Sequence, residues 1–148
     1  MDDLAPADAA ALGLDDPFAR QLIQVVYRSR SITDANGERD ILEASRRNNP
    51  ARDITGVLVS HGGWFMQVLE GPAAEVSALL KRIEQDNRNG QFLLLRAMPI
   101  DTRDFGDWSM GSTSVDEDRF LQMLVGFMSG KPESRRLLRD FMLGGGEP

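Results

Sequence analysis

The order of strand-like and helix-like apolar patterns is the feature that most restricts the fold of this chain. Short β-branched and aromatic runs are typical of buried strands, whereas apolar residues spaced three and four apart are typical of one helix face. The patterns follow one another as strand, helix, strand, strand, helix and strand, with a further short candidate at the end. The expected elements are a strand at 22–27, a helix at 40–49, strands at 54–60 and 64–69, a helix at 72–87, a strand at 92–96 and a short last strand at 105–110.

This order is that of the split βαβ unit in ferredoxin-like folds. We therefore expect an α+β, ferredoxin-like βαββαβ sandwich with a mixed sheet, in which right-handed crossovers place both helices on one face. The connection His61-Gly62-Gly63 is short and contains glycine, which predicts a β-hairpin. Two C-terminal helices, at 116–130 and 134–143, carry apolar stripes that can cover the opposite face of the sheet.

The chain is expected to form one folded unit, because 148 residues fit a single domain and no linker or repeat divides them. We expect an acidic flexible leader at 1–20 and a folded core at 21–112. A C-terminal helical cap or output region is expected at 113–143. A disordered tail is expected at 144–148, where three consecutive glycines begin.

Composition argues against several classes of function. The chain has no cysteine and one histidine, so thiolate or multi-histidine metal sites, disulfides and cysteine nucleophiles are not expected. The first twenty residues carry five aspartates against one arginine and the rest is nearly neutral, which argues against direct binding of nucleic acid. Neither a transmembrane run nor a secretory signal is visible, so a cytoplasmic protein without membrane contact is expected.

Polar residues that interrupt apolar patterns are the candidate functional residues. Tyr27 ends the first expected strand, Gln67 lies inside the strand at 64–69, and Asn48 and Asn49 end the first expected helix. Each type also has a structural interpretation: a core tyrosine with its hydroxyl bonded, a glutamine that faces solvent, or asparagines that end a helix. Taken singly, these positions leave both interpretations open.

The order and spacing of these residues along the chain favour the functional interpretation over the structural one. The relevant segments are Tyr27-Arg28-Ser29, Ser45-Arg46-Arg47-Asn48-Asn49, Asp53-Ile54-Thr55-Gly56-Val57-Leu58, Phe65-Met66-Gln67-Val68-Leu69-Glu70-Gly71-Pro72, Asp86-Asn87-Arg88 and Arg103-Asp104-Phe105-Gly106-Asp107-Trp108-Ser109-Met110-Gly111. In this order and spacing, from about residue 22 to 111, the chain closely resembles the BLUF domain, the family of blue-light sensors that use flavin. The family's ferredoxin-like fold, with flavin held between the two helices, agrees with the topology expected above.

The resemblance implies a role for each matching residue. Tyr27 is similar to the family's photoactive tyrosine and Gln67 to its switching glutamine. The residues implied in flavin binding are Ser29, Asn48, Asn49, Asp86 and Arg88, and those implied in signal output are Trp108 and Met110. The family often has histidine at position 89, where this chain has Asn89, and the difference concerns a ribityl or phosphate contact.

The residue types suit that chemistry. A phenol can donate an electron and then a proton to an excited flavin, and a glutamine amide has one donor end and one acceptor end, so turning or tautomerising it reverses the local hydrogen bonds. The resemblance implies a non-covalently bound flavin, with FAD favoured over FMN or riboflavin. It also implies a slightly red-shifted state that forms in blue light and reverts in the dark. Without cysteine, a flavin–thiol adduct is impossible.

The resemblance is to the short, stand-alone members of the family, because the residues after Gly111 are too few for an effector domain. We therefore expect no enzymatic activity. The signal is expected to leave through the last strand and the C-terminal helices to a downstream signalling protein, and a homo-oligomer is expected.

The alternative is a non-photoactive ferredoxin-like module that binds a ligand or interacts with a partner. One version, an acylphosphatase-like hydrolase, needs a loop that cradles phosphate, but the loop at 31–37 has one glycine and an acidic residue, so this version is weak. A small-ligand or non-photoactive flavin module stays open on the residue patterns alone. A colourless purified protein would favour a module without flavin.

Overall fold

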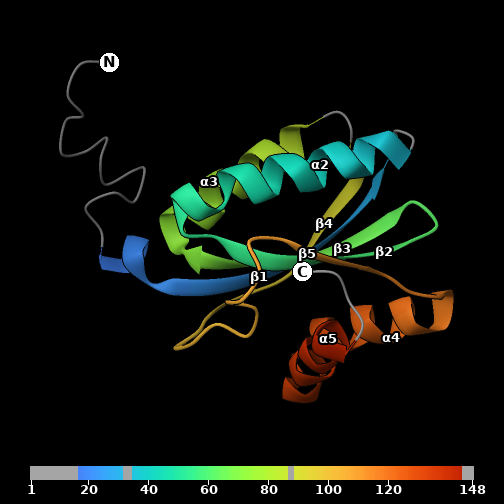
Figure 1. Cartoon of the computed structure of the whole chain (residues 1–148). Coiled ribbons are helices and arrows are strands. Elements are labelled where there is room, and N and C mark those ends of the chain that lie inside the picture. The colour runs from blue at the N-terminus through green and yellow to red at the C-terminus, as the bar shows by residue number, and fades with distance from the viewer. Residues whose placement is uncertain (1–16, 32–34, 87–88, 145–148) are drawn as a thin grey trace.

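A five-stranded sheet with helices on both faces forms the body of the protein (Figure 1). The computed structural model describes residues 17–31, 35–86 and 89–144. The elements are, in chain order, the 3-10 helix η1 (Pro17–Arg20), β1 (Leu22–Ser31), α2 (Ala35–Asn48), the 3-10 helix η2 (Pro50–Arg52), β2 (Thr55–His61), β3 (Trp64–Pro72), α3 (Ala73–Gln85), β4 (Asn89–Pro99), β5 (Gly111–Ser114), α4 (Glu117–Met128) and α5 (Pro132–Gly144).

The strands lie side by side in the order β4-β1-β3-β2-β5. β1 pairs antiparallel with β3 and β4, and β2 pairs antiparallel with β3, which is the arrangement of a ferredoxin-like sheet. β5 pairs parallel with β2 and makes the sheet mixed. α2 and α3 lie together on one face of the sheet, and α4 and α5 lie on the other (Figure 1). The predicted fold class is therefore confirmed.

The prediction of a last strand at 105–110 is wrong, because β5 begins only at Gly111. Residues 105–110 form a loop with a turn, in which the Trp108 N–H donates to the Phe105 carbonyl oxygen at 3.4 Å. The side chains of Phe105 and Trp108 pack together on the α4 and α5 face, whereas Met110 packs on the opposite face. The aromatic composition that resembled a strand serves instead to bury this loop against the sheet.

Several boundaries also differ from the prediction. β1 continues to Ser31, past the expected 27, and β3 continues to Pro72, past the expected 69. α2 begins at Ala35, ahead of the expected 40, and β4 runs from Asn89 to Pro99 and exceeds the expected 92–96. Asn36 and Gly37 have low helix propensity, so the sequence pattern placed the start of this helix too late. The hairpin between β2 and β3 is confirmed.

The hairpin turn consists of Gly62 and Gly63, whose φ angles of 53° and 87° are both left-handed. Two successive left-handed residues match the twist of a two-residue hairpin, and glycine adopts this conformation without a steric cost. His61 therefore belongs to β2, one residue beyond the expected strand.

The described residues begin within the expected leader, at η1. After η1 the chain is fixed at Gln21, whose carbonyl accepts from Ala73 N at 2.9 Å and whose Nε2 donates to the Ile100 carbonyl at 3.2 Å. The predicted flexibility of residues 1–16 and 145–148 lies outside the described residues. Within the ranges that the structure describes, no helix is long and apolar enough to cross a membrane.

Apolar side chains alternate between two clusters, one on each face of the sheet. Val25 and Leu58 belong to the cluster under α2 and α3, and Val26 and Val57 belong to the cluster under α4 and α5. This alternation follows from the two-residue period of a strand. A few polar side chains are buried as well: Gln24, Ser29, Asn49, Gln67, Glu70 and Ser112. Buried polar groups need partners, and the partners of Gln24, Asn49, Gln67 and Glu70 define the two sites described below.

Candidate functional site

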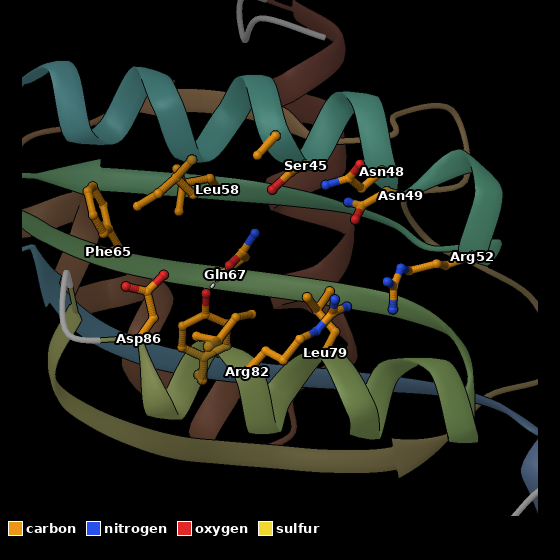
Figure 2. Close-up of a pocket in the computed structure, with 14 residues that line it drawn as sticks. Ser45, Asn48, Asn49, Arg52, Leu58, Phe65, Gln67, Leu79, Arg82 and Asp86 are labelled. Atoms are coloured by element: carbon orange, nitrogen blue, oxygen red, sulfur yellow. Dashed lines mark hydrogen bonds between the residues drawn. The ribbon is translucent and has the colours of Figure 1, made fainter. Parts of the chain in front are cut away.

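A cavity of about 200 Å³ lies over the sheet between α2 and α3 (Figure 2). Its lining residues are Tyr27, Ile41, Ala44, Ser45, Asn48, Asn49, Arg52, Leu58, Phe65, Gln67, Leu79, Arg82, Ile83 and Asp86. The cavity therefore brings together five of the predicted site residues, which come from β1, β3, α2 and the segment around α3 and its end.

Tyr27 and Gln67 meet at the floor of this cavity. They are direct partners in the register of β1 and β3, so their side chains point to the same face of the sheet. The Tyr27 hydroxyl donates a hydrogen bond to Gln67 Oε1 (dashed in Figure 2). Both side chains are buried, so Gln67 does not face solvent and that structural interpretation is wrong.

The phenol of Tyr27 is held in its protonated form. Burial raises the pKa of Tyr27 well above its ordinary value of 10.0, and the negative charge of Asp86 raises this pKa further. The ring also stacks on Phe92, with ring centroids 5.1 Å apart. Tyr27 is therefore a fixed hydrogen-bond donor toward Gln67.

The other end of the Gln67 amide contacts Met110. Gln67 Nε2 donates to Met110 Sδ at 3.2 Å, and Met110 is only 1% exposed. A thioether sulfur is a weak acceptor, so this contact holds the amide less firmly than the bond from Tyr27 does. The amide thus has a strong partner on one side and a weak one on the other.

The two asparagines at the end of α2 differ in their surroundings. Asn49 is buried, and its Nδ2 donates to the Ser109 carbonyl at 2.7 Å, while Asn48 is exposed and lines the cavity. The Asn49 backbone carbonyl accepts from Ile54 N at 3.0 Å, so the residue also shapes the turn after the helix. The prediction that these asparagines end the helix is confirmed, and the Asn49 side chain additionally ties α2 to the segment before β5.

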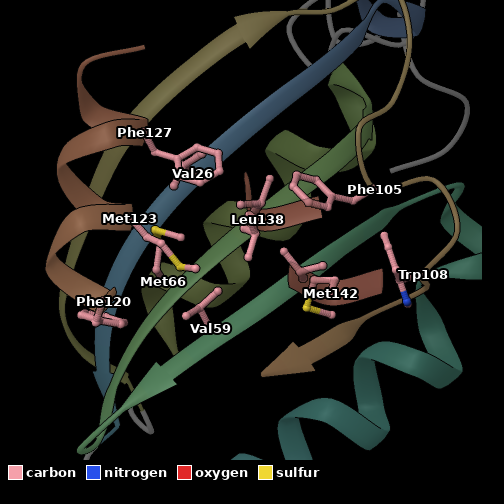
Figure 3. Close-up of a cluster of buried hydrophobic side chains, with 12 residues drawn as sticks. Val26, Val59, Met66, Phe105, Trp108, Phe120, Met123, Phe127, Leu138 and Met142 are labelled. Carbon is pink, nitrogen blue, oxygen red and sulfur yellow. The ribbon is translucent and has the colours of Figure 1, made fainter. Parts of the chain in front are cut away.

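Trp108 and Met110 lie on opposite sides of the sheet edge. Trp108 belongs to the apolar cluster that includes Phe105, Leu138 and Met142 (Figure 3). Met110 belongs to the cluster beneath the cavity. The segment is fixed to the sheet and to α2, because Gly56 N donates to the Trp108 carbonyl at 3.0 Å and Arg46 Nε donates to the Met110 carbonyl at 2.9 Å. Three residues therefore join the cavity to the packing of the C-terminal helices.

The three remaining residues predicted to bind flavin differ in their position relative to the cavity. Asp86 follows the end of α3 and lines the cavity. Ser29 is 1% exposed on the same strand as Tyr27, and its Oγ has no hydrogen-bond partner among the described residues, but Ser29 does not line the cavity. Arg88 lies outside the described residues.

Sequence patterns missed two cationic residues in the lining, Arg52 and Arg82. A signal for Arg82 was present, because Leu79, Arg82, Ile83 and Asp86 follow a three-and-four spacing that places them on one helix face. Arg52 carried no comparable signal. Its position depends on η2, which turns the chain back toward the cavity after Asn49.

Comparisons with known proteins agree with this site. A family model described as sensors of blue light using FAD matches residues 22–111. The blue light- and temperature-regulated antirepressor BluF of Escherichia coli (strain K12) is 31% identical over 91 residues, which cover 60% of this chain and 23% of the antirepressor. Photoactivated adenylate cyclase subunit alpha of Euglena gracilis is 37% identical over 70 residues, which cover 47% of this chain and 7% of the cyclase subunit. The chain thus spans only a small part of these relatives.

Solved structures match over a larger share of their length. The dark-state structure of the BLUF protein BlrB has a TM-score of 0.65 and 30% identity, with 83% of this chain and 96% of that chain covered. The photo-activated structure of BlsA has a TM-score of 0.69 and 25% identity, with 86% of this chain and 98% of that chain covered. Because the family model matches more than half of its residues, the chain belongs to the BLUF family of blue-light sensors that use FAD.

Proposed function

We propose that Tyr27 and Gln67 are the photoactive pair of this sensor, and that a change in the Gln67 amide reaches α4 and α5 through Met110 and Trp108. The observation that carries this proposal is a continuous series of contacts. Tyr27 donates to Gln67, Gln67 donates to Met110 Sδ at 3.2 Å, and Trp108, two residues before Met110, packs with α5 on the other face.

The residues present fit a flavin. Apolar side chains from α2 and α3 (Ile41, Leu79 and Ile83) suit the apolar faces of a flat ring, and the amides of Asn48, Asn49 and Gln67 suit the carbonyl and nitrogen atoms at its edge. Asn49 Nδ2 already donates to Ser109, so we assign Asn49 Oδ1 to the flavin edge. Ser29 is outside the cavity lining, but its Oγ has no partner among the described residues and lies on the Tyr27 strand, so we retain it as a candidate contact of the flavin.

The rim of the cavity suits the polar tail of FAD. Arg52 and Arg82 supply positive charge for a phosphate, and Asp86 can accept from a ribityl hydroxyl. We retain Arg88 as a further candidate for the same tail. When bound, the flavin supplies the light absorption and the redox chemistry, so the protein needs only to orient it and to respond.

The response follows from the protonation of Tyr27. Because burial and Asp86 disfavour a phenolate, Tyr27 keeps its proton at Oη in the dark. Tyr27 would lose this proton only after giving up an electron, with a bound, excited flavin as the acceptor of both. Loss of that proton removes the donor that holds Gln67 Oε1. The amide can then turn or tautomerise, which reverses its donor and acceptor ends toward Tyr27 and Met110.

The change at Met110 has a direct route to the C-terminal helices. Met110 and Trp108 share one short segment, and Trp108 packs in the same cluster as Leu138 and Met142 of α5. Methionine packs adaptably, so Met110 can follow a change in the amide without leaving a cavity. Met110 and Trp108 are two positions apart in the chain and pack on opposite faces of the sheet. A movement of this segment would therefore carry the signal from one face to the other.

We further propose that residues 21–112 form the flavin-binding core and that 113–143 form the output region. The helix η1 at Pro17–Arg20 lies within the expected leader, and α5 continues to Gly144, the first residue of the expected tail. α4 exposes Leu121, Val125 and Met128 along one side, which suits a partner or a second copy. A bacterial light-regulated adenylyl cyclase has a TM-score of 0.59, but the match covers only 36% of that chain. We propose a cytoplasmic, oligomeric sensor whose region 22–111 senses light without being catalytic itself, and which acts on a downstream signalling protein.

Replacement of Gln67 tests this proposal. Gln67→Ala should retain flavin but lose the red shift in blue light, because the amide that reverses its hydrogen bonds is gone. Gln122→Ala, at an exposed position on α4, is the matched control and should shift as the wild type does. A normal, dark-reversible red shift in Gln67→Ala would contradict the assignment, and a wild-type protein with flavin but no shift would favour the non-photoactive module.

A further inference from the structure

A second polar site lies on the sheet face opposite the flavin cavity, around Glu70. Glu70 stands three residues after Gln67 in β3, so its side chain points to the other face, and it is 0% exposed. A buried carboxylate is costly unless hydrogen-bond donors surround it. The donors around Glu70 therefore show what this residue holds in place.

Both oxygens of the Glu70 carboxylate accept hydrogen bonds. Oε1 accepts from Phe105 N at 2.7 Å, and Oε2 accepts from Asp104 N at 2.9 Å and from Gln24 Nε2 at 2.7 Å. Burial raises the pKa of Glu70, and these three bonds work in the opposite direction. The carboxylate thus fixes two successive backbone amides of the loop that leads to Trp108.

A second set of bonds ties the start of the same loop to the sheet. Arg103 Nη1 donates to Thr55 Oγ1 at 2.9 Å and to the Glu70 carbonyl at 3.2 Å. Arg103 Nη2 also lies 3.0 Å from Asp53 Oδ1. The loop at 103–107 is therefore held to β2 and β3 by both Arg103 and the Glu70 carboxylate.

Two arginines of helix α5 bind this loop. Arg135 Nε lies 2.9 Å from Asp104 Oδ2, an oxygen that also accepts from Gln24 Nε2 at 2.9 Å. Arg139 donates to the Asp104 carbonyl and lies 3.5 Å from Asp107 Oδ2. The pair at Asp104 is the more shielded of the two, so it is the stronger attachment of α5.

We propose that Glu70 is a positioning residue that couples the segment at 108–110 to α5, by fixing the loop on which Arg135 and Arg139 hold that helix. The inference rests on the proposed function for the light-driven change at Met110. Only two residues lie between Phe105 and Trp108, and Trp108 N donates to the Phe105 carbonyl at 3.4 Å. A displacement of 108–110 therefore changes the Glu70 hydrogen bonds or moves the loop. Either result alters the contacts of Arg135 and Arg139 that hold α5 on this loop.

Amide hydrogen exchange of α5, measured in the dark and under blue light on the flavin-bound full chain, tests this coupling. Wild type should show a light-minus-dark difference in α5. Glu70→Gln keeps the shape but provides one acceptor oxygen in place of two, so it should retain the red shift and lose the α5 difference. A purely structural role would alter exchange equally in both conditions and would leave the difference intact.

Arg135→Gln provides an independent variant if Glu70→Gln does not fold, and Arg136→Gln, at an exposed position on the same helix, is its matched control. Arg135→Gln should lose the light-dependent difference in α5, and Arg136→Gln should keep it. The proposal is overturned if Arg135→Gln keeps the wild-type difference, or if a wild type that shifts normally has no difference in α5. A flavin-bound wild type without any red shift would instead refute the proposed function.

Discussion

Gln67 donates to Met110 Sδ at 3.2 Å while it accepts from Tyr27 at the opposite end of the same amide. The two bonds differ in strength, because a hydroxyl is a good donor to an amide oxygen and a thioether is a weak acceptor for an amide nitrogen. In the proposed mechanism, the state of Tyr27 therefore controls the amide, and Met110 follows it. This asymmetry gives the site a direction, from the phenol toward the C-terminal helices.

Truncation of Met110 should separate the photochemistry from its output. Met110→Ala should keep the red shift but lose the light-dependent change in α5 or in oligomer size, because the side chain that follows Gln67 is gone. Since Met110 is 1% exposed, the variant should also lose about 2–5 kcal/mol in the free energy of unfolding, measured by urea denaturation. Met128→Ala, at a side chain 55% exposed, should change that free energy by less than about 0.5 kcal/mol. If Met110→Ala shows the same light-dependent change in α5 or in oligomer size as the wild type, Met110 does not take part in signal output.

The phenol of Tyr27 should resist ionisation at alkaline pH. Tyr27 is the only tyrosine in the chain, so phenolate absorbance reports on this residue alone. The folded protein should show no phenolate at pH values just above 10.0, whereas the urea-unfolded chain should titrate near that ordinary value. Because the folded form binds the proton more tightly, its contribution to stability is complete below pH 10.0 and is lost as the pH rises toward the native pKa.

Two measurements check this expectation: the ultraviolet difference spectrum against pH, and urea denaturation at the same pH values. Tyr27→Phe should remove this part of the pH dependence. A folded protein whose tyrosine titrates at or below the ordinary value would contradict the buried donor described for the site.

Gly56 should tolerate no side chain. A Cβ at Gly56 would lie 2.0 Å from the Val68 carbonyl oxygen of the neighbouring strand, and Gly56 N donates to the Trp108 carbonyl. Gly56→Ala should therefore cost about 1–3 kcal/mol in the free energy of unfolding. Gly106→Ala is the control, because its Cβ would meet only the Arg103 side chain at 3.4 Å. Equal stability of the two variants in urea denaturation would contradict the close approach of β2 and β3 at this position.

The sequence predicted the order of the elements and several residues of the cavity. It did not predict which hydrogen-bond partners those residues would have. Tyr27 and Gln67 were recognisable as polar residues in apolar strands, but their hydrogen bond depends on the register between β1 and β3, which no local pattern determines. The loop at 105–110 was misread as a strand because aromatic residues suit both a strand and a buried loop.

Glu70 shows a second limit of the sequence. The residue stands inside a recognised motif, yet nothing nearby in the chain indicated that it is buried and fully bonded. Its donors Asp104 and Phe105 lie more than thirty residues away and reach it only after the loop has folded onto β3. Long-range partners of this kind follow from tertiary packing and not from local periodicity.

The absorption spectrum of the purified protein before and after blue light, recorded for wild type and Tyr27→Phe, tests whether Tyr27 and Gln67 perform the light response. Wild type should carry a flavin band that shifts slightly to longer wavelength in blue light and returns in the dark. Tyr27→Phe should bind flavin and show no shift, because the donor to Gln67 is absent. A wild type that binds flavin but never shifts, or a Tyr27→Phe variant that shifts normally, would contradict the claim that this pair performs the light response.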